Sequence, residues 1–317
     1  MKIAVVGPGA VGGYFGARLA EAGNAVTFLA RGRTLEALRT QGLRVTSLLG
    51  NVHLEQPDTT DDLGAVGTVD LVLVCVKSWQ VAEVAPTLGP LMGDSTCVLP
   101  LQNGVEAVET LVDSVGRGPV LGGICKVISR IDTPGHILHL GADPTIEFGE
   151  VGGTTVSERV EAIARTFEGA GIVTQRFVDA RVAIWGKFLF IAVVSGLGAV
   201  TRADLGALRS LPETRRMLVQ GMDEVIAVAR GQGVELAPDI IERTLDFIDS
   251  LPADSTASMQ RDLMAGRPSE LEAQNGAVVR LGARCGVDTP LHRFIHHSLL
   301  PMERAARGQL ADGAIVQ

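Results

Sequence analysis

Short, almost continuously apolar runs alternate with helical stretches through the first half of the chain. The runs that we expect to form strands are 3–6, 25–29, 70–76 and 95–101, with further strands near 120–121 and at 145–148. A helix is expected at 14–22, between the first two of these strands. Strands that are apolar at nearly every position, with helices between them, are typical of a parallel sheet covered on both faces. The first half is therefore predicted to be an α/β domain.

The hydrophobic pattern changes after about Phe177. Apolar residues from Met217 to Ala229 recur at helical spacing. Pro268 is expected to open a further helix, with Gly286 as its C-terminal cap. No convincing alternating strand pattern occurs in this half, which is predicted to be all helical.

Length, charge and hydropathy limit the classes of protein to which the chain can belong. A chain of 317 residues favours two domains, which we place at 1–177 and 178–317. The net charge of −8 provides no basic footprint, so nucleic acid is not an expected partner. The longest apolar run, 188–200, is shorter than the roughly 20 residues that a membrane span needs. We expect a soluble, cytoplasmic protein that does not associate with a membrane.

The cysteine and histidine positions indicate neither disulfides nor a metal site. None of Cys75, Cys97, Cys125 and Cys285 forms a C-x-x-C pair, so reduced and mostly buried thiols are expected. The histidines lack the usual metal-ligand spacings.

The strongest local motif is a glycine-rich segment at the N-terminus. It reads Gly7-Pro8-Gly9-Ala10-Val11-Gly12 and lies between a predicted strand and a predicted helix. Gly7 permits the tight turn, Gly9 lets the backbone approach a pyrophosphate, and Gly12 allows close packing of helix and strand. The context favours a dinucleotide-binding loop over a purely structural turn.

The end of the second predicted strand distinguishes between the two nicotinamide dinucleotides. An NAD site usually has an acid there, whereas this segment reads Leu29-Ala30-Arg31-Gly32-Arg33. Arg31 and Arg33 suit charge-assisted bonds to a 2′-phosphate, which favours NADP(H). The alternative is two solvated arginines in a loop.

Two further polar residues follow predicted strands. Lys77 comes directly after the strand that ends at Val76, and Asn103 closely follows the strand that ends at Leu101. Open α/β sheets bind ligands at the carboxyl edge of their strands, so Gly7, Arg31, Lys77 and Asn103 are expected to lie along one such edge.

The second half contains weaker candidates. Lys187 precedes a strongly apolar run, where partial desolvation would lower its pKa and make it a usable proton donor, although spacing alone favours a lysine that snorkels at a helix end. Glu270 and Glu272 lie in the first turns of the helix expected from Pro268, where acids commonly serve as dipole partners. Ser258 is ambiguous on spacing alone.

Taken in order, these motifs resemble the ketopantoate reductase (2-dehydropantoate 2-reductase) family over nearly the whole chain. The matching segments are Gly7-x-Gly9-x-x-Gly12, Arg31, Val76-Lys77, Gln102-Asn103-Gly104, Trp185-x-Lys187, Ser258-Met259, and Glu270 ahead of Asn275-Gly276. The resemblance implies a Rossmann-like NADP-binding domain followed by an all-α domain of the 6-phosphogluconate-dehydrogenase type. It also implies NADPH-dependent reduction of ketopantoate, a 2-oxo acid, to pantoate for pantothenate and coenzyme A synthesis.

The resemblance also assigns a role to each residue that it matches. Lys187 matches the lysine that protonates the oxygen as it becomes an alkoxide, and Asn103 matches a residue that touches both nicotinamide and substrate. Lys77 and Arg31 match cofactor contacts. Glu270 matches a residue that bonds the nicotinamide ribose and steadies the lysine. Ser258 matches a residue that bonds the substrate carboxylate.

The chain differs from the family at three positions near this site. Ile191 and Ser195 stand where the best-known members carry asparagines that follow the lysine, and Ser255 stands where they often have a third. Ser195 is kept as a candidate substrate contact. Because lost hydrogen-bond donors weaken discrimination, a paralogous reductase of another 2-oxo acid remains an alternative, as does a non-catalytic NADPH-binding sensor. The helical half has apolar faces enough for a homodimer.

Overall fold

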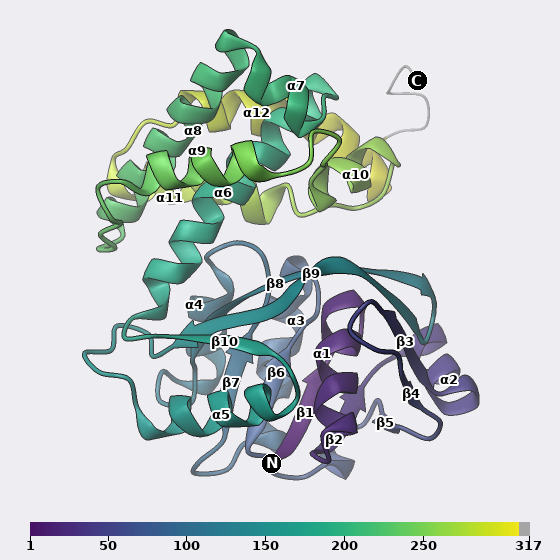
Figure 1. Ribbon diagram of the computed structural model, residues 1–317. Coiled ribbons are helices and arrows are strands. Elements are labelled where there is room, and N and C mark those ends of the chain that lie inside the picture. The colour runs from purple at the N-terminus through teal and green to yellow at the C-terminus, as the bar shows by residue number, and fades with distance from the viewer. Residues whose placement is uncertain (311–317) are drawn as a thin grey trace. The chain divides into compact units, whose positions relative to one another are not determined.

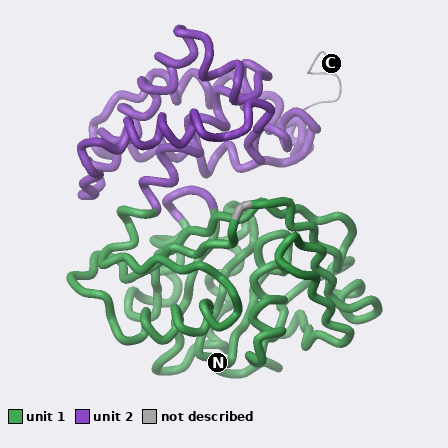
Figure 2. Tube along the Cα trace, viewed as in Figure 1, with its two compact units in different colours: residues 1–102, 107–183 green, residues 103–106, 184–317 purple. Residues whose placement is uncertain are grey.

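The computed structural model describes residues 1–310, apart from the side chain of Ala142. The chain forms two compact units (Figure 2). The first contains residues 1–102 and 107–183, and the second contains residues 103–106 and the chain from 184 onward. A short segment from the middle of the first unit is therefore part of the second.

A parallel five-stranded sheet forms the centre of the first unit (Figure 1). Its strands, in the order β5-β2-β1-β6-β7, are β5 (Asp58–Thr60), β2 (Ala25–Leu29), β1 (Lys2–Val6), β6 (Leu71–Val74) and β7 (Cys97–Pro100). In the central strand β1, Val5 pairs with Phe28 on one side and with Leu73 on the other. All three side chains are completely buried. The four apolar runs predicted as strands form four of its five strands, which confirms the parallel arrangement, whereas the short edge strand β5 was not predicted.

A second sheet in the first unit was not predicted. It contains β10 (Val173–Phe177), β9 (His136–Gly149), β3 (Leu43–Ser47) and β4 (Val52–Leu54) in that order, with β8 (Gly122–Thr133) paired to β9. The run expected at 145–148 is one end of β9, but Val120 forms an isolated bridge to Val98 instead of starting a strand. Polar, exposed positions alternate through much of β8, so it has no apolar run from which a strand could be recognised.

Helix α1 (Ala10–Glu21) lies between the two sheets (Figure 1). A side chain at Gly16 would collide with the Phe28 ring on β2, and one at Gly13 would lie 3.1 Å from Ile137 Cγ1 on β9. The missing side chains at Gly13 and Gly16 thus allow both sheets to approach α1. The helix begins four residues before the expected start at Tyr14, because the glycine-rich segment itself forms its first turn.

Within the described residues, the first unit contains four further helices. They are α2 (Gly32–Gln41), α3 (Val81–Val84), α4 (Ala107–Val115) and α5 (Glu158–Gly169), and single 3-10 turns occur at 63–65, 78–80, 85–87 and 89–91. The turn at 78–80 and α3 connect β6 to the segment before β7, so they position the residues that follow β6.

The second unit contains helices and no strand in the part that the structure describes, which confirms the predicted all-α second half. Its helices are α6 (Ala180–Thr201), whose first turn belongs to the first unit, α7 (Leu205–Ser210), α8 (Pro212–Gly231), α9 (Ile240–Ser250), α10 (Ser258–Met264), a π-helix (Glu272–Gly276), α11 (Ala277–Cys285) and α12 (Pro290–Ala306). The helix predicted from Met217 to Ala229 is part of α8.

Helix α6 is long and apolar enough, by length and composition alone, to cross a membrane. However, 72% of its most apolar 18-residue stretch is buried inside the structure. Phe188, Leu189, Val193 and Leu197 are at most 1% exposed and belong to the core cluster of the second unit. The apolar composition of α6 is accounted for by its position as a core helix.

The prediction that a helix begins at Pro268 was wrong in its starting residue. The Ser269 N–H donates to Glu303 Oε2 at 3.0 Å, and the Leu271 N–H donates to Ser269 Oγ at 3.2 Å. These bonds hold the segment outside a helix, so Glu270 precedes the π-helix and does not lie in a first helical turn. The expected cap at Gly286 is confirmed, since this residue ends α11 with a φ of 73°.

Candidate active site

The glycine-rich segment joins β1 to α1 in the first unit, and two of its glycines are required by the protein's own packing. Gly7 has a φ of 88°, and its N–H donates to Leu29 O at 3.1 Å. A Cβ at Gly7 would lie 2.8 Å from Val76 N. A Cβ at Gly12 would lie 2.8 Å from Cys75 Cβ. These two positions leave no space for a side chain.

Gly9 differs, because nothing in the protein requires its side chain to be missing. A Cβ there would meet a single neighbour within 4 Å, Ile131 Cδ1 at 3.9 Å. Gly9 is the N-cap of α1 and offers no side chain to cap the first-turn N–H groups, and the first turn has no acid. The positive end of the helix is therefore open to an anion, and the backbone can be approached closely. This cradle fits the pyrophosphate of a dinucleotide.

The remaining residues of the loop are braced from the second sheet. Pro8 is buried, whereas Ala10 and Val11 are half-buried. Ser129 Oγ, on β8, donates to Ala10 O at 3.1 Å. The unpredicted sheet thus holds the loop in place.

Arg31 is the N-cap of α2, directly after β2. Its Nη1 lies 2.8 Å from Glu83 Oε1 on α3, and the two side chains are 64% and 63% exposed. Arg33 is exposed in the first turn of α2. The sequence indicated the two arginines but not Glu83, which lies 52 residues further along the chain from Arg31.

Lys77 follows β6, and its ammonium lies 5.8 Å from the centre of the Trp79 ring. The chain before it is held by Gln102, whose Nε2 donates to Val74 O at 2.8 Å and to Val76 O at 2.9 Å. Gln102 is buried after β7, so it ties the carboxyl ends of β6 and β7 together. Sequence reasoning gave Gln102 no role, because an amide beside two apolar strands shows no charge pattern.

Gly7, Arg31 and Lys77 lie at the carboxyl ends of β1, β2 and β6, as expected. Asn103 belongs instead to the second unit, where its Nδ2 donates to Glu270 Oε2 at 3.1 Å. Asn103 nevertheless follows the carboxyl end of β7, where it was expected, three residues after Pro100. The structure does bring together Asn103 and Glu270, two of the site residues that the sequence suggested.

A network of charged side chains fastens the segment 103–106 to the helices of the second unit. Arg280 lies 2.7 Å from Glu106 Oε2 and 2.8 Å from Glu272 Oε2. His296 Nε2 lies 3.0 Å from Glu272 Oε1, and this bond is the main reason that the pKa of Glu272 is lowered. A Cβ at Gly276 would lie 2.7 Å from Glu272 Oε2, so the network needs a glycine there. It restrains the segment that begins with Asn103.

Lys187, Ile191 and Ser195 follow one another at four-residue spacing on α6, which places them on one face of the helix. Lys187 and Ile191 are half-buried, whereas Ser195 is completely buried. The Ser195 hydroxyl donates to Ile191 O and contacts Gln274 Oε1 of the π-helix. The structure therefore corrects the expectation of a substrate contact at Ser195, because its hydroxyl is used within the helical core.

Ser258 is the first residue of α10 and is half-buried. The next polar residue on that helix, Gln260, is buried and donates from Nε2 to Ala203 O at 2.8 Å. This bond fastens the start of α10 to the residues that follow α6.

The cysteines are free, with Cys97 and Cys125 buried and Cys75 and Cys285 half-buried. Its surroundings raise the pKa of the Cys75 thiol above its usual range, which favours the neutral thiol. Among residues 1–310, no group of three or more His, Cys, Asp or Glu side chains is arranged to hold a metal ion.

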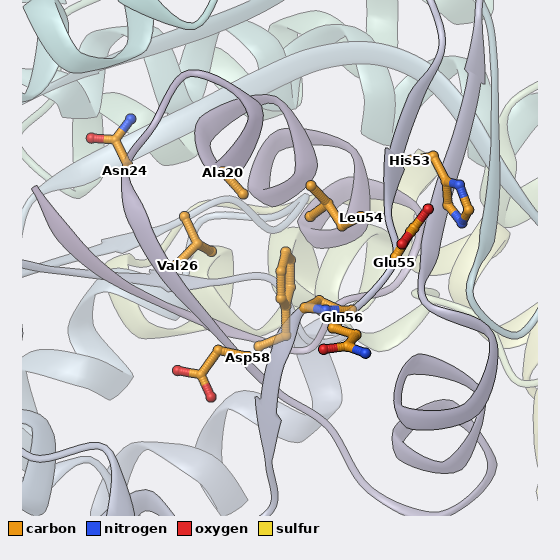
Figure 3. A pocket seen from close by; sticks show the side chains of 10 residues that line it. Ala20, Asn24, Val26, His53, Leu54, Glu55, Gln56 and Asp58 are labelled. Atoms are coloured by element: carbon orange, nitrogen blue, oxygen red, sulfur yellow. The ribbon is translucent and has the colours of Figure 1, made fainter.

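A hollow of about 360 Å³ opens at the other end of α1 (Figure 3). It is lined by Ala20, Asn24, Val26, Phe28, His53, Leu54, Glu55, Gln56, Pro57 and Asp58. Asn24 is in the turn between α1 and β2, at the amino edge of the parallel sheet. Because the glycine loop is at the carboxyl edge, the hollow is separate from the candidate site.

Both halves of the chain match one family of known proteins. Residues 3–153 match ketopantoate reductase PanE/ApbA, and residues 179–303 match the C-terminal part of ketopantoate reductase PanE/ApbA. An uncharacterized oxidoreductase, YkpB, of Bacillus subtilis (strain 168) is 31% identical over 301 residues, which cover 94% of this chain and 98% of the relative. The 2-dehydropantoate 2-reductase of Halobacterium salinarum is 32% identical over 296 residues, which cover 93% and 96%.

Solved structures show the same relationship. The crystal structure of 2-dehydropantoate 2-reductase from Geobacter metallireducens GS-15 matches with a TM-score of 0.87 at 31% identity, covering 95% of this chain and 99% of that one. A ternary structure of D-mandelate dehydrogenase with NADH and anilino(oxo)acetate matches with a TM-score of 0.88 at 22% identity, covering 97% and 99%, and shares the fold. From its two matched halves and its relatives of about 30% identity, the chain is an oxidoreductase that belongs to the ketopantoate reductase family.

Proposed function

We propose that the protein is a 2-dehydropantoate 2-reductase that uses NADPH to reduce ketopantoate to (R)-pantoate, for pantothenate and coenzyme A synthesis. The observation that carries the proposal is the bond between Asn103 Nδ2 and Glu270 Oε2, at 3.1 Å. It joins two residues, matched to family site positions, that lie 167 residues apart in the chain.

The first unit would hold the nicotinamide dinucleotide. The cradle at Gly9 would receive the pyrophosphate, and Arg31 would bind the 2′-phosphate that distinguishes NADP(H) from NAD(H). Lys77 would supply a second positive charge beside the cofactor. In the second unit, Asn103 and Glu270 would contact the nicotinamide and its ribose.

The helical unit would supply the proton. Bound NADPH provides the hydride for C2 of the keto acid, which leaves negative charge on the carbonyl oxygen. The Lys187 ammonium would stabilise that charge and then donate its proton to the oxygen. Glu270 would hold the lysine in its charged form, and Asn103 would orient the carbonyl. Ser258 would donate a hydrogen bond to the substrate carboxylate.

A paralogous reductase of another, more apolar 2-oxo acid is the second candidate. Ile191 places an apolar side chain one helical turn after Lys187, and the Ser195 hydroxyl is buried in the helical core. Both features remove polar groups that would recognise the hydroxyl of ketopantoate, a kind of change that can alter selectivity by orders of magnitude.

Steady-state kinetics with a panel of 2-oxo acids and both cofactors separates the candidates. The proposal expects ketopantoate with NADPH to give the highest kcat/KM. A branched 2-oxo acid without the hydroxyl as the best substrate would favour the paralogue. Binding of NADPH without its oxidation by any 2-oxo acid would favour a non-catalytic sensor.

We further propose that the protein acts in the cytoplasm on this small substrate, without a membrane or nucleic acid as partner, and that it assembles as a homodimer. Light scattering of the purified protein in solution would test the assembly, since a mass of one chain, 33.3 kDa, would contradict the homodimer.

A further inference from the structure

The end of β2 lacks the acid of a typical NAD site, yet a carboxylate lies beside it in space. Glu83, on α3, places Oε1 2.8 Å from Nη1 of Arg31. Both residues belong to the first unit, and neither side chain is buried. The fold therefore brings an acid from the segment after β6 to the place where the adenine ribose of a dinucleotide would be recognised.

This ion pair can be exchanged at little cost. Exposed ion pairs contribute little to stability, because water solvates both charges almost as well as they solvate each other. A 2′-phosphate that approaches Arg31 would compete with Glu83 for the same guanidinium. Once bound, its charge would lie close to the carboxylate and be repelled by it. A free 2′-hydroxyl would be attracted by Glu83 and not repelled, since a carboxylate accepts its hydrogen bond.

We propose that Glu83 is a specificity-determining residue that moderates the preference for NADPH and allows the same site to accept NADH. Arg31 binds the 2′-phosphate of one cofactor, and Glu83 accepts from the 2′-hydroxyl of the other. This inference rests on the proposed function, in which Arg31 recognises the 2′-phosphate.

The test uses two fragments that differ only in the group at issue, 2′,5′-ADP and 5′-AMP, with Kd measured by calorimetry on the full-length protein. We expect Glu83→Gln to lower the Kd of 2′,5′-ADP by about fivefold. This is the scale of the effect of removing one like charge a few ångströms away in a solvated site. The substitution should weaken the binding of 5′-AMP, because the amide oxygen of glutamine is a weaker acceptor for the 2′-hydroxyl than a carboxylate. The ratio of kcat/KM for NADPH to that for NADH should rise by a similar factor.

Glu109→Gln is the matched control. Glu109 forms an ion pair of comparable exposure with Arg117 in the same unit, where the two side chains are 59% and 58% exposed. This variant should leave both Kd values unchanged. If Glu83→Gln leaves the ratio of the two Kd values unaltered, or weakens 2′,5′-ADP, the inference is overturned while the proposed function stands. If the wild-type protein binds neither NADPH nor NADH, the proposed function itself fails and the inference fails with it.

Discussion

Asn103 Nδ2 donates to Glu270 Oε2 at 3.1 Å, and so joins the chain just beyond β7 to the segment just before the π-helix. Glu270 is 6% exposed, so its carboxylate has little access to water and depends on such partners. The bond makes the position of Asn103 sensitive to the charge and length of residue 270.

We therefore expect Glu270→Gln and Glu270→Ala to behave differently. A glutamine can still accept a hydrogen bond from Asn103, but it carries no negative charge that would stabilise the Lys187 ammonium. We therefore expect kcat to fall by about 10- to 100-fold with a small change in KM. Alanine removes the acceptor as well and should also raise the KM for the nicotinamide cofactor. Steady-state kinetics checks both variants, and a glutamine variant with wild-type kcat would show that the charge of Glu270 is not needed.

Lys187→Ala should lower kcat by about 10² or more, the usual scale for losing a positioned proton donor. The NADPH affinity of the variant should stay close to that of the wild type, because Lys187 acts on the substrate oxygen. Stopped-flow measurement of hydride transfer and titration with NADPH test the two statements. A near-normal kcat would remove Lys187 from the mechanism.

Arg31→Ala should weaken the binding of NADPH far more than the binding of NADH, because only NADPH carries the 2′-phosphate. Arg117→Ala removes an arginine of similar exposure in the same unit and should affect neither cofactor. Binding titrations with both cofactors provide the comparison. Equal weakening of the two by Arg31→Ala would mean that Arg31 does not read the 2′-phosphate.

Substitutions at two glycines of the loop should have different effects, one on the stability of the protein and the other on dinucleotide binding. In Gly12→Ala the new Cβ would lie 2.8 Å from Cys75 Cβ and crowd Gly7 O, so the variant should unfold at a clearly lower temperature. In Gly9→Ala the new Cβ would lie 3.9 Å from its nearest neighbour, Ile131 Cδ1. The unfolding temperature should therefore stay unchanged, while dinucleotide binding should weaken. Thermal melts with and without NADPH measure both effects. Normal NADPH binding by Gly9→Ala would contradict the assignment of the cradle.

His292 should make the protein less stable in mild acid. Its Nε2–H donates to Gly221 O at 3.1 Å, and its Nδ1 accepts from Asn275 Nδ2 at 2.9 Å, so both ring nitrogens are used by the neutral form. Burial lowers its pKa from 6.5 to about 4. Between these values the unfolded chain binds a proton that the folded chain does not. The free energy of unfolding contributed by this group therefore falls as pH drops, by about 1.4 kcal/mol per pH unit.

Urea unfolding of the wild type and of His292→Gln at about pH 7.5 and about pH 5 tests this prediction. The loss of stability between the two pH values should be smaller in the variant by about 1 kcal/mol or more. His297→Gln, which changes an exposed histidine on the same helix, should lose as much stability as the wild type. An unchanged pH dependence in His292→Gln would show that another group is responsible.

Four strands of the parallel sheet could be predicted from the sequence because they are largely buried and hence apolar at nearly every position, whereas the polar edge strand β5 could not. The β8–β9 ribbon could not, because it pairs long, partly exposed strands with register shifts after Lys126, Ile128 and Ile131. Such strands have neither a continuous apolar run nor a regular alternation. The missed ribbon matters for the site, since Ser129 on β8 braces the glycine loop.

Site residues could be proposed from the sequence where a basic residue comes shortly after a predicted strand, as Arg31 does after β2 and Lys77 after β6. Glu83 was not, because a single acid on a short helix looks solvated until folding places it beside Arg31. Ser195 shows the opposite case. The family resemblance suggested a substrate contact there, but only packing against Gln274 reveals that its hydroxyl lies inside the core.

Residues 103–106 interrupt the first unit and pack with the second, so neither unit is one uninterrupted stretch of chain. A chimera that takes everything after residue 183 from a relative would combine a foreign Glu270 with the original Asn103, and a foreign Arg280 with the original Glu106. Recombination at a single crossover thus takes the two partners of each pairing from different parents. Exchange of the helical half between members of this family would have to carry a four-residue insert as well, which favours evolution of the two halves together over modular shuffling.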